Sequence, residues 1–166
     1  MKRIRLAALS LFAFMSLIPS ARAQVDAKLA DAVKHAKVSL DAGLKPSERE
    51  GQPISGKFEL EDGKLQLSVY TTKGGKYYEV VVDHTTGKIA KAEEITSGDD
   101  LTAAKAQAEA MAKAKRSLLD AVKAAETVNK GFHGISVTPA LKDAHPIATV
   151  TVNKEHETRT ATEKLD

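Results

Sequence analysis

The chain has 166 residues, contains no cysteine, and carries 25 Lys and Arg against 22 Asp and Glu. Four of the basic residues and none of the acidic ones lie within residues 1–23, so subtracting them leaves 21 bases against 22 acids. A chain with that balance lacks the basic excess that nucleic-acid binding requires. The absence of cysteine excludes disulfides, thiol catalysis, Cys-ligated zinc and a lipidated N-terminal cysteine.

Residues 1–23 have the pattern of an export signal. Basic residues within 2–5 precede an apolar run at 6–18, and Ala21 and Ala23 place small side chains at the two positions that a signal peptidase recognises. The apolar run is shorter than the ~20 residues that a membrane-spanning helix needs. We therefore expect cleavage between Ala23 and Gln24, and a mature protein that is periplasmic or secreted and has no stable membrane insertion.

The remaining chain shows an internal similarity. Residues 29–36 (LADAVKHA) and 118–125 (LLDAVKAA) are identical at six of eight positions. Two turn-forming segments, 62–64 (DGK) and 143–145 (DAH), follow in the same order, each between two alternating apolar runs. This order predicts two copies of a helix followed by a hairpin.

In the first copy, apolar residues recur at helical spacing from Val25 to Leu44, which predicts an amphipathic helix. Asp62-Gly63 and Gly74-Gly75 are two-residue turns of the type that closes hairpins, so they predict a strand on either side. The expected strands are residues 54–61, 64–72 and 76–83, with a weaker edge strand at 89–95.

The two turns also predict which residues pair across these strands. The expected pairs are Phe58–Leu67, Leu60–Leu65, Leu67–Val82, Val69–Val80 and Thr71–Tyr78. Because side chains alternate across a sheet, these residues share one face, which the preceding helix covers. The opposite face is predicted to be polar and exposed to solvent; it carries Tyr70 and Tyr77, whereas Tyr78 lies on the core face.

The second copy begins with a predicted Ala-rich helix over Leu101–Val128. Its length of about 40 Å at 1.5 Å per residue exceeds what one small sheet can cover. We interpret its first half as a helical spacer or as a surface shared with the first copy. Strands are expected at 135–141, 146–153 and 157–165, and Pro139 indicates an edge or a bulge. The expected fold class is α+β, with two small helix-plus-antiparallel-sheet meander repeats joined by the Ala-rich helix.

Two segments of the first copy, 62–64 (DGK) and 77–89 (YYEVVVDHTTGKI), resemble the PepSY domain family, which is named for peptidase propeptides and a spore-cortex protein. The second copy matches at 118–125 and 142–152. The resemblance implies one domain at 24–97, and at 98–166 a helical spacer and a second domain shortened at its C-terminus. It further implies an exported, non-catalytic protein that binds, and inhibits or regulates, a peptidase outside the cytoplasm.

No pattern in the sequence indicates an active site. The five histidines form no close metal-binding pair, and there is no nucleophile elbow or phosphate-binding loop. We therefore predict no catalytic residues, no metal site and no cofactor. Two alternatives remain: a periplasmic metal- or small-ligand-binding accessory protein, in which His133, His145 and His156 converge through the fold, and a hydrolase in its own right.

Tyr70 and Tyr77 are the candidate residues for binding a protein partner. Tyrosine is favoured at interfaces because its ring is apolar while its hydroxyl stays hydrated. The alternatives are a cross-strand pair that only stiffens the hairpin, or a face that is buried against the second copy. Exposed sheet edges, expected at 54–61 and near the C-terminus, could pair with another chain or accept a peptide strand.

Overall fold

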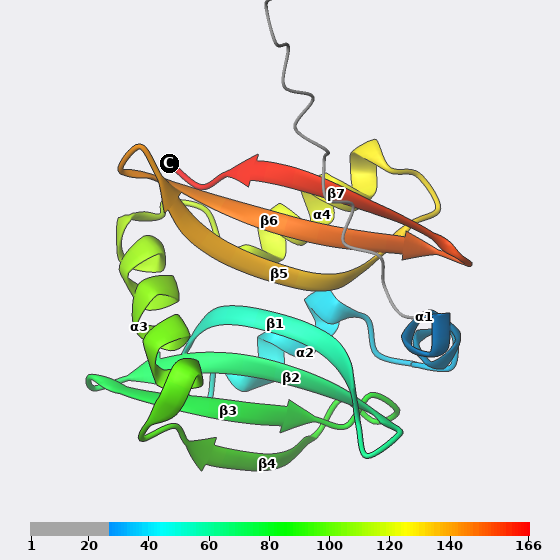
Figure 1. The fold of residues 1–166 in the computed structure, drawn as a ribbon, viewed down its shortest axis with the longest axis horizontal. Helices are drawn as coiled ribbons and strands as arrows, with labels where there is room; N and C mark the ends of the chain where they lie inside the picture. The colour runs from blue at the N-terminus through cyan, green and yellow to red at the C-terminus, as the bar shows by residue number, and fades with distance from the viewer. Residues whose placement is uncertain (1–26) are drawn as a thin grey trace, which may run out of the picture.

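A single seven-stranded antiparallel sheet runs through the whole fold, in the strand order β4-β3-β2-β1-β5-β6-β7 (Figure 1). The computed structural model describes residues 27–166, so the expected signal peptide at 1–23 lies outside the described residues. The strands are β1 (Gln52–Glu61), β2 (Lys64–Lys73), β3 (Lys76–Val82), β4 (Ile89–Glu94), β5 (His133–Lys142), β6 (His145–Lys154) and β7 (Glu157–Lys164). The helices are α1 (Ala27–Val33), α2 (Leu40–Ser47), α3 (Gly98–Lys113) and α4 (Leu118–Val128).

The predicted fold class, two separate helix-plus-sheet repeats, is wrong. Strand β1 pairs with β5, through Gly56 opposite Val137 and Lys57 opposite Ser136, so the two meanders form one continuous sheet. A lone β1 edge would leave its backbone N–H and C=O groups unpaired, and β5 supplies partners at the two positions where the strands meet. The edge expected at 54–61 therefore lies in the centre of the sheet, and the edge strands are β4 and β7.

The strands themselves and their register agree with the sequence predictions. All five expected pairs are present: Phe58–Leu67, Leu60–Leu65, Leu67–Val82, Val69–Val80 and Thr71–Tyr78. Pro139 was expected at an edge or a bulge. It lies instead in the interior strand β5, at a position that pairs with β6 but not with β1. The bulge in β5 falls between Gly134 and Ser136.

The long helix predicted over 101–128 is broken into α3 and α4. Ala114 has an extended backbone (φ −74°, ψ 142°), which ends α3. Ser117 begins α4 with a capping box, in which its hydroxyl accepts from the Asp120 backbone N–H and its own N–H donates to the Asp120 carboxylate. The helix expected from Val25 to Leu44 is likewise divided, into α1 and α2.

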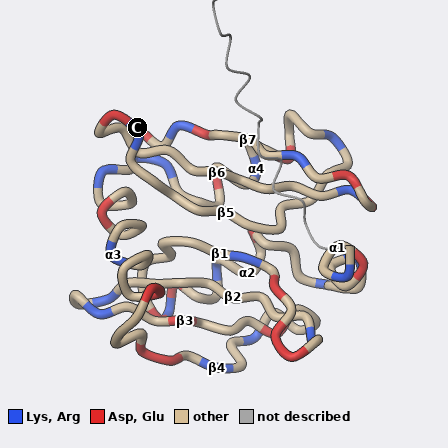
Figure 2. Tube along the Cα trace, viewed as in Figure 1, with Lys and Arg blue, Asp and Glu red and all other residues tan. Residues whose placement is uncertain are grey.

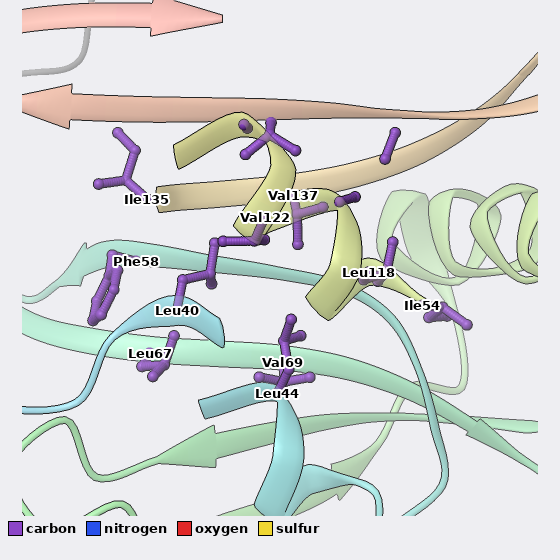
Figure 3. Close-up of a cluster of buried hydrophobic side chains, with 14 of the residues drawn as sticks. Leu40, Leu44, Ile54, Phe58, Leu67, Val69, Leu118, Val122, Ile135 and Val137 are labelled. Carbon is purple, nitrogen blue, oxygen red and sulfur yellow. The ribbon is translucent and has the colours of Figure 1, made fainter. Parts of the chain in front are cut away.

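Helices α2 and α4 pack side by side on one face of the sheet, which we call the core face (Figure 1). Glycines let them approach closely: a Cβ at Gly56 would lie 3.2 Å from Leu44, and one at Gly134 would lie 2.9 Å from Val122. Figure 3 shows the resulting cluster, in which side chains of both helices meet those of β1, β2 and β5. Both halves of the chain thus contribute to one hydrophobic core.

Candidate functional site

Tyr70 and Tyr77 lie on the sheet face opposite the core face, as predicted, but that face is not open to solvent throughout. Tyr70 is paired with Ser55 on β1, and the Ser55 hydroxyl donates a 2.7 Å hydrogen bond to the side-chain oxygen of Gln107 on α3. Helix α3 therefore packs against this second face, which we call the α3 face (Figure 1). The Ala-rich helix is a covering layer of the sheet and not a spacer between modules.

All three tyrosines are half-buried. The register places Tyr77 opposite Thr72 on the α3 face and Tyr78 opposite Thr71 on the core face, which confirms the predicted partition. The three tyrosines differ less in solvent exposure than predicted. Helix α3 shields one side of the sheet, and β3 lies next to the edge strand β4. Their role in binding a partner stays a prediction.

A network of polar side chains extends from Tyr70 along the α3 face. The Ser68 hydroxyl, which is fully buried, lies 2.8 Å from a carboxylate oxygen of Glu59 and 2.8 Å from one of Glu79. The Gln66 amide donates to the Ser68 oxygen at 2.9 Å. Since a hydroxyl carries a single proton, Ser68 can donate to only one carboxylate at a time. Ser68 thus orders two acidic side chains next to each other at the surface.

Lys57 connects this network to Tyr70. Its ammonium group lies 2.6 Å from a Glu59 oxygen and 5.6 Å from the centre of the Tyr70 ring. Burial lowers the pKa of Lys57, but the interactions with Glu59 and Tyr70 outweigh it, so the pKa lies above its usual value. Burial also raises the pKa of Tyr70, with Lys57 opposing and Glu79 adding to the effect. Both shifts favour the protonated forms, an ammonium group on Lys57 and a neutral phenol on Tyr70.

The three histidines considered as metal ligands do not converge. His133 begins β5 and His145 begins β6, and because these strands are antiparallel their first residues lie at opposite ends of the hairpin. The His145 ring nitrogen instead lies 2.8 Å from the Asp166 carboxylate, and His156 lies in the turn between β6 and β7. Within residues 27–166 no group of three or more His, Asp or Glu side chains is placed to hold a metal ion.

Two clefts that sequence reasoning missed flank the junction between β1 and β5. The first, of about 390 Å³, lies between the α3–α4 junction and the start of β1; we call it the α4 cleft. The second, of about 480 Å³, lies between the α1–α2 junction and the start of β5; we call it the α1 cleft. The α1 cleft is lined by residues of both β1 and β5 and lies where these strands have separated, beyond their two paired residues.

The sequence contains one sign of these clefts, a short repeated motif, A-K-x-S-L. It occurs at 36–40 and at 114–118, and in both places it joins two helices. The surroundings are equivalent: the two backbone N–H groups that precede the serine donate to His84 O in the first case and to Leu165 O in the second. The similarity between 29–36 and 118–125 relates α1 to α4. These helices do not occupy equivalent places, because α1 precedes its A-K-x-S-L motif whereas α4 follows its own.

Lys and Arg are interspersed with Asp and Glu along the described part of the chain (Figure 2). Among residues 27–166, no helix is both long enough and apolar enough to cross a membrane.

Comparisons with known proteins identify no family for this chain. No protein-family model matches the chain, and no curated protein matches it. Among solved structures, the chain is similar to the crystal structure of a proposed lipoprotein (CD1622) from Clostridium difficile 630, with 10% sequence identity and a TM-score of 0.46. The alignment covers 79% of this chain and 88% of that one.

Proposed function

We propose that the mature protein is an exported, non-catalytic binding protein that inhibits or otherwise regulates a peptidase in the periplasm or medium. The export pattern of residues 1–23 supports the compartment, and the resemblance of 62–64 and 77–89 to PepSY domains supports the class of partner. We expect no enzymatic activity, no cofactor and no binding to nucleic acid at physiological salt.

The observation that carries the binding role is the ordered cluster on the α3 face. Lys57, Glu59 and Tyr70 are positioned by mutual contacts before any partner arrives, so little side-chain entropy is lost on binding. With Glu79 included, the cluster has two carboxylates and one ammonium group, and thus a net charge of −1. It therefore favours a partner surface that carries Lys or Arg together with an apolar group that can pack on the Tyr70 ring.

The test starts from the mature protein, Gln24–Asp166, immobilised and exposed to the envelope fraction of its own source. A peptidase that is recovered repeatedly is purified, and its activity on a peptide substrate is measured with increasing amounts of the mature protein. We expect a saturable change in activity. A recovered set without any peptidase, or a peptidase whose activity does not respond, would contradict the proposal.

Variants of the tyrosines then test the face. Replacing Tyr70 and Tyr77 by Ala should weaken the binding of that peptidase, whereas Tyr78→Ala on the core face should lower the melting temperature and leave the affinity unchanged. Tyr70→Phe serves as the control that keeps the ring packed beside Lys57. If the double variant binds as tightly as the wild type, the α3 face is not the interface.

The alternative of a small-ligand-binding accessory protein has one observation in its favour, the α1 cleft. Its volume of about 480 Å³ lies within the range of small-molecule sites, and its lining is partly apolar and includes several charged residues. The histidine-based metal version of this alternative has no comparable support among the described residues.

A further inference from the structure

The α1 cleft is lined by both apolar and charged residues. Its apolar lining comes from α1 and the α1–α2 junction, with Ala30, Val33 and Val38, and from Phe58 of β1. The charged residues that line it are Lys34, Lys37, Lys154 and Glu155. Since Lys34 is paired with Asp31, two further lysines and one carboxylate remain along the lining, an excess that favours a ligand with negative charge.

Two of these lysines lie on opposite sides of the cleft. Lys37 belongs to the α1–α2 junction, and Lys154 ends β6, next to the β6–β7 turn. Lys34 is already paired, because its ammonium group lies 2.8 Å from Asp31. Lys37 and Lys154 are therefore the lining cations that remain to meet an anionic group, with Glu155 and the Glu126 carboxylate bonded to Gly134 as the opposing charges.

The cleft is open because β1 and β5 separate beside it. Beyond Lys57 the strand β1 no longer pairs with β5, and the Gly134 backbone N–H donates to the Glu126 carboxylate at 2.7 Å instead of to a β1 carbonyl. The separation of the strands is thus stabilised by a side chain from α4. Phe58, only 4% exposed, lies at the base of the gap.

We propose that the α1 cleft binds a linear amphipathic anion, an aliphatic chain that ends in a carboxylate. The chain packs on Phe58 and Val33, and the carboxylate lies between the Lys37 and Lys154 ammonium groups. This inference rests on the small-ligand alternative above. It is independent of the peptidase interaction, which involves the α3 face, so either can fail without the other.

The α4 cleft provides a matched comparison within the same molecule. Its lysine, Lys115, occupies the same place in the A-K-x-S-L motif as Lys37. However, the neighbouring Arg116 is already engaged with the Lys164 carbonyl oxygen at 2.8 Å, and Glu48 lies on the opposite wall. Lys115→Gln therefore removes an equivalent exposed charge from the other cleft and controls for a general loss of positive charge.

The experiment is calorimetric titration of the mature protein with sodium decanoate below its micelle concentration. We expect one site per chain, and an affinity that rises by about fourfold for each CH₂ between hexanoate and decanoate, since a buried CH₂ is worth about 0.8 kcal/mol. Decyltrimethylammonium, with the same chain and the opposite charge, should bind at least tenfold more weakly. Equal binding of the two, or no decanoate binding at millimolar concentration, would overturn the proposal.

Variants and amide resonances locate the site. Lys37→Gln combined with Lys154→Gln should weaken decanoate binding at least fivefold without changing the melting temperature, whereas Lys115→Gln should leave it unchanged. In proton–nitrogen correlation spectra, decanoate should shift the Gly131 and Gly134 amides, which line the α1 cleft, and not Gly51, which lines the α4 cleft. The reverse pattern in either measurement would assign the ligand to the other cleft and refute the inference.

Discussion

The Ser55 hydroxyl on β1 and the Gln107 side-chain oxygen on α3 are joined by a hydrogen bond of 2.7 Å across 52 positions of sequence. Ser55 is 5% exposed and faces the same side of the sheet as Tyr70. This contact joins α3 to the sheet face that carries Tyr70.

Removing that hydrogen bond should loosen α3. We expect Ser55→Ala to lower the free energy of unfolding by about 1 kcal/mol, the usual net worth of one hydrogen bond, as measured by urea denaturation. Gln107→Ala should cost a similar amount, and the double variant should cost less than the sum because both remove the same contact. Full additivity would show that the bond does not stabilise the fold; Lys105→Ala, exposed on α3, is the control.

Adjacent valines of β3 test the two faces of the sheet. Val80 is fully buried on the core face, so Val80→Asp places an unpaired charge in the core and should prevent folding, as seen by circular dichroism. Val81 is paired with Ser68 and Lys91 on the α3 face and is half-buried. Val81→Asp should therefore cost only about 1 kcal/mol, within the range of strand propensities. Equal damage by both substitutions would contradict the assigned faces.

The capping box of α4 predicts a pH-dependent contribution to stability. Hydrogen bonds from the Ser117 hydroxyl and backbone hold the pKa of Asp120 below its usual value. A carboxyl whose pKa is lowered on folding adds stability above its unfolded pKa of about 3.9, and this is lost as pH falls through the lower folded value. Asp120→Asn should therefore reduce the melting temperature at pH 7, and the difference from the wild type should diminish below pH ~4. A difference that stays constant to pH 2 would exclude this ionic contribution.

Export can be checked directly on the protein made from the full-length chain. The small residues at 21 and 23 predict a mature N-terminus at Gln24, which intact-mass measurement of the periplasmic or secreted protein would show. Replacing Ala21 and Ala23 by Asp should block cleavage and leave the precursor in the membrane fraction. Recovery of an exported protein that retains Met1 would contradict the prediction.

Local patterns predicted the strands and their register because the forces that set them are local. The Asp62-Gly63 and Gly74-Gly75 turns bring neighbouring segments together, and the alternation of side chains then assigns each residue to a face. For that reason the sequence predicted which sheet face carries each of Tyr70, Tyr77 and Tyr78. The break before α4 also has a local signal, the capping box of Ser117 and Asp120, which the prediction of one helix over 101–128 did not use.

The joining of β1 to β5 had no local signal. Gly56 and Val137 are 81 positions apart, and nothing in either strand marks it as the partner of the other. Their pairing depends on α2 and α4 packing side by side, which aligns the two strands beneath them. The position of α3, and with it the partial burial of Tyr70, follows from that arrangement.

By itself, the sequence determined the strands, the turns, the composition of each sheet face and the pattern of an export signal, since each depends on residues close together in the chain. Only the tertiary structure decided that the two meanders share one sheet, that α3 covers part of the tyrosine face, and that clefts open beside the α1–α2 and α3–α4 junctions. The physical reason is that these features depend on which apolar surfaces cover one another over long sequence separations, and many pairings of similar strands and helices satisfy the same local pattern.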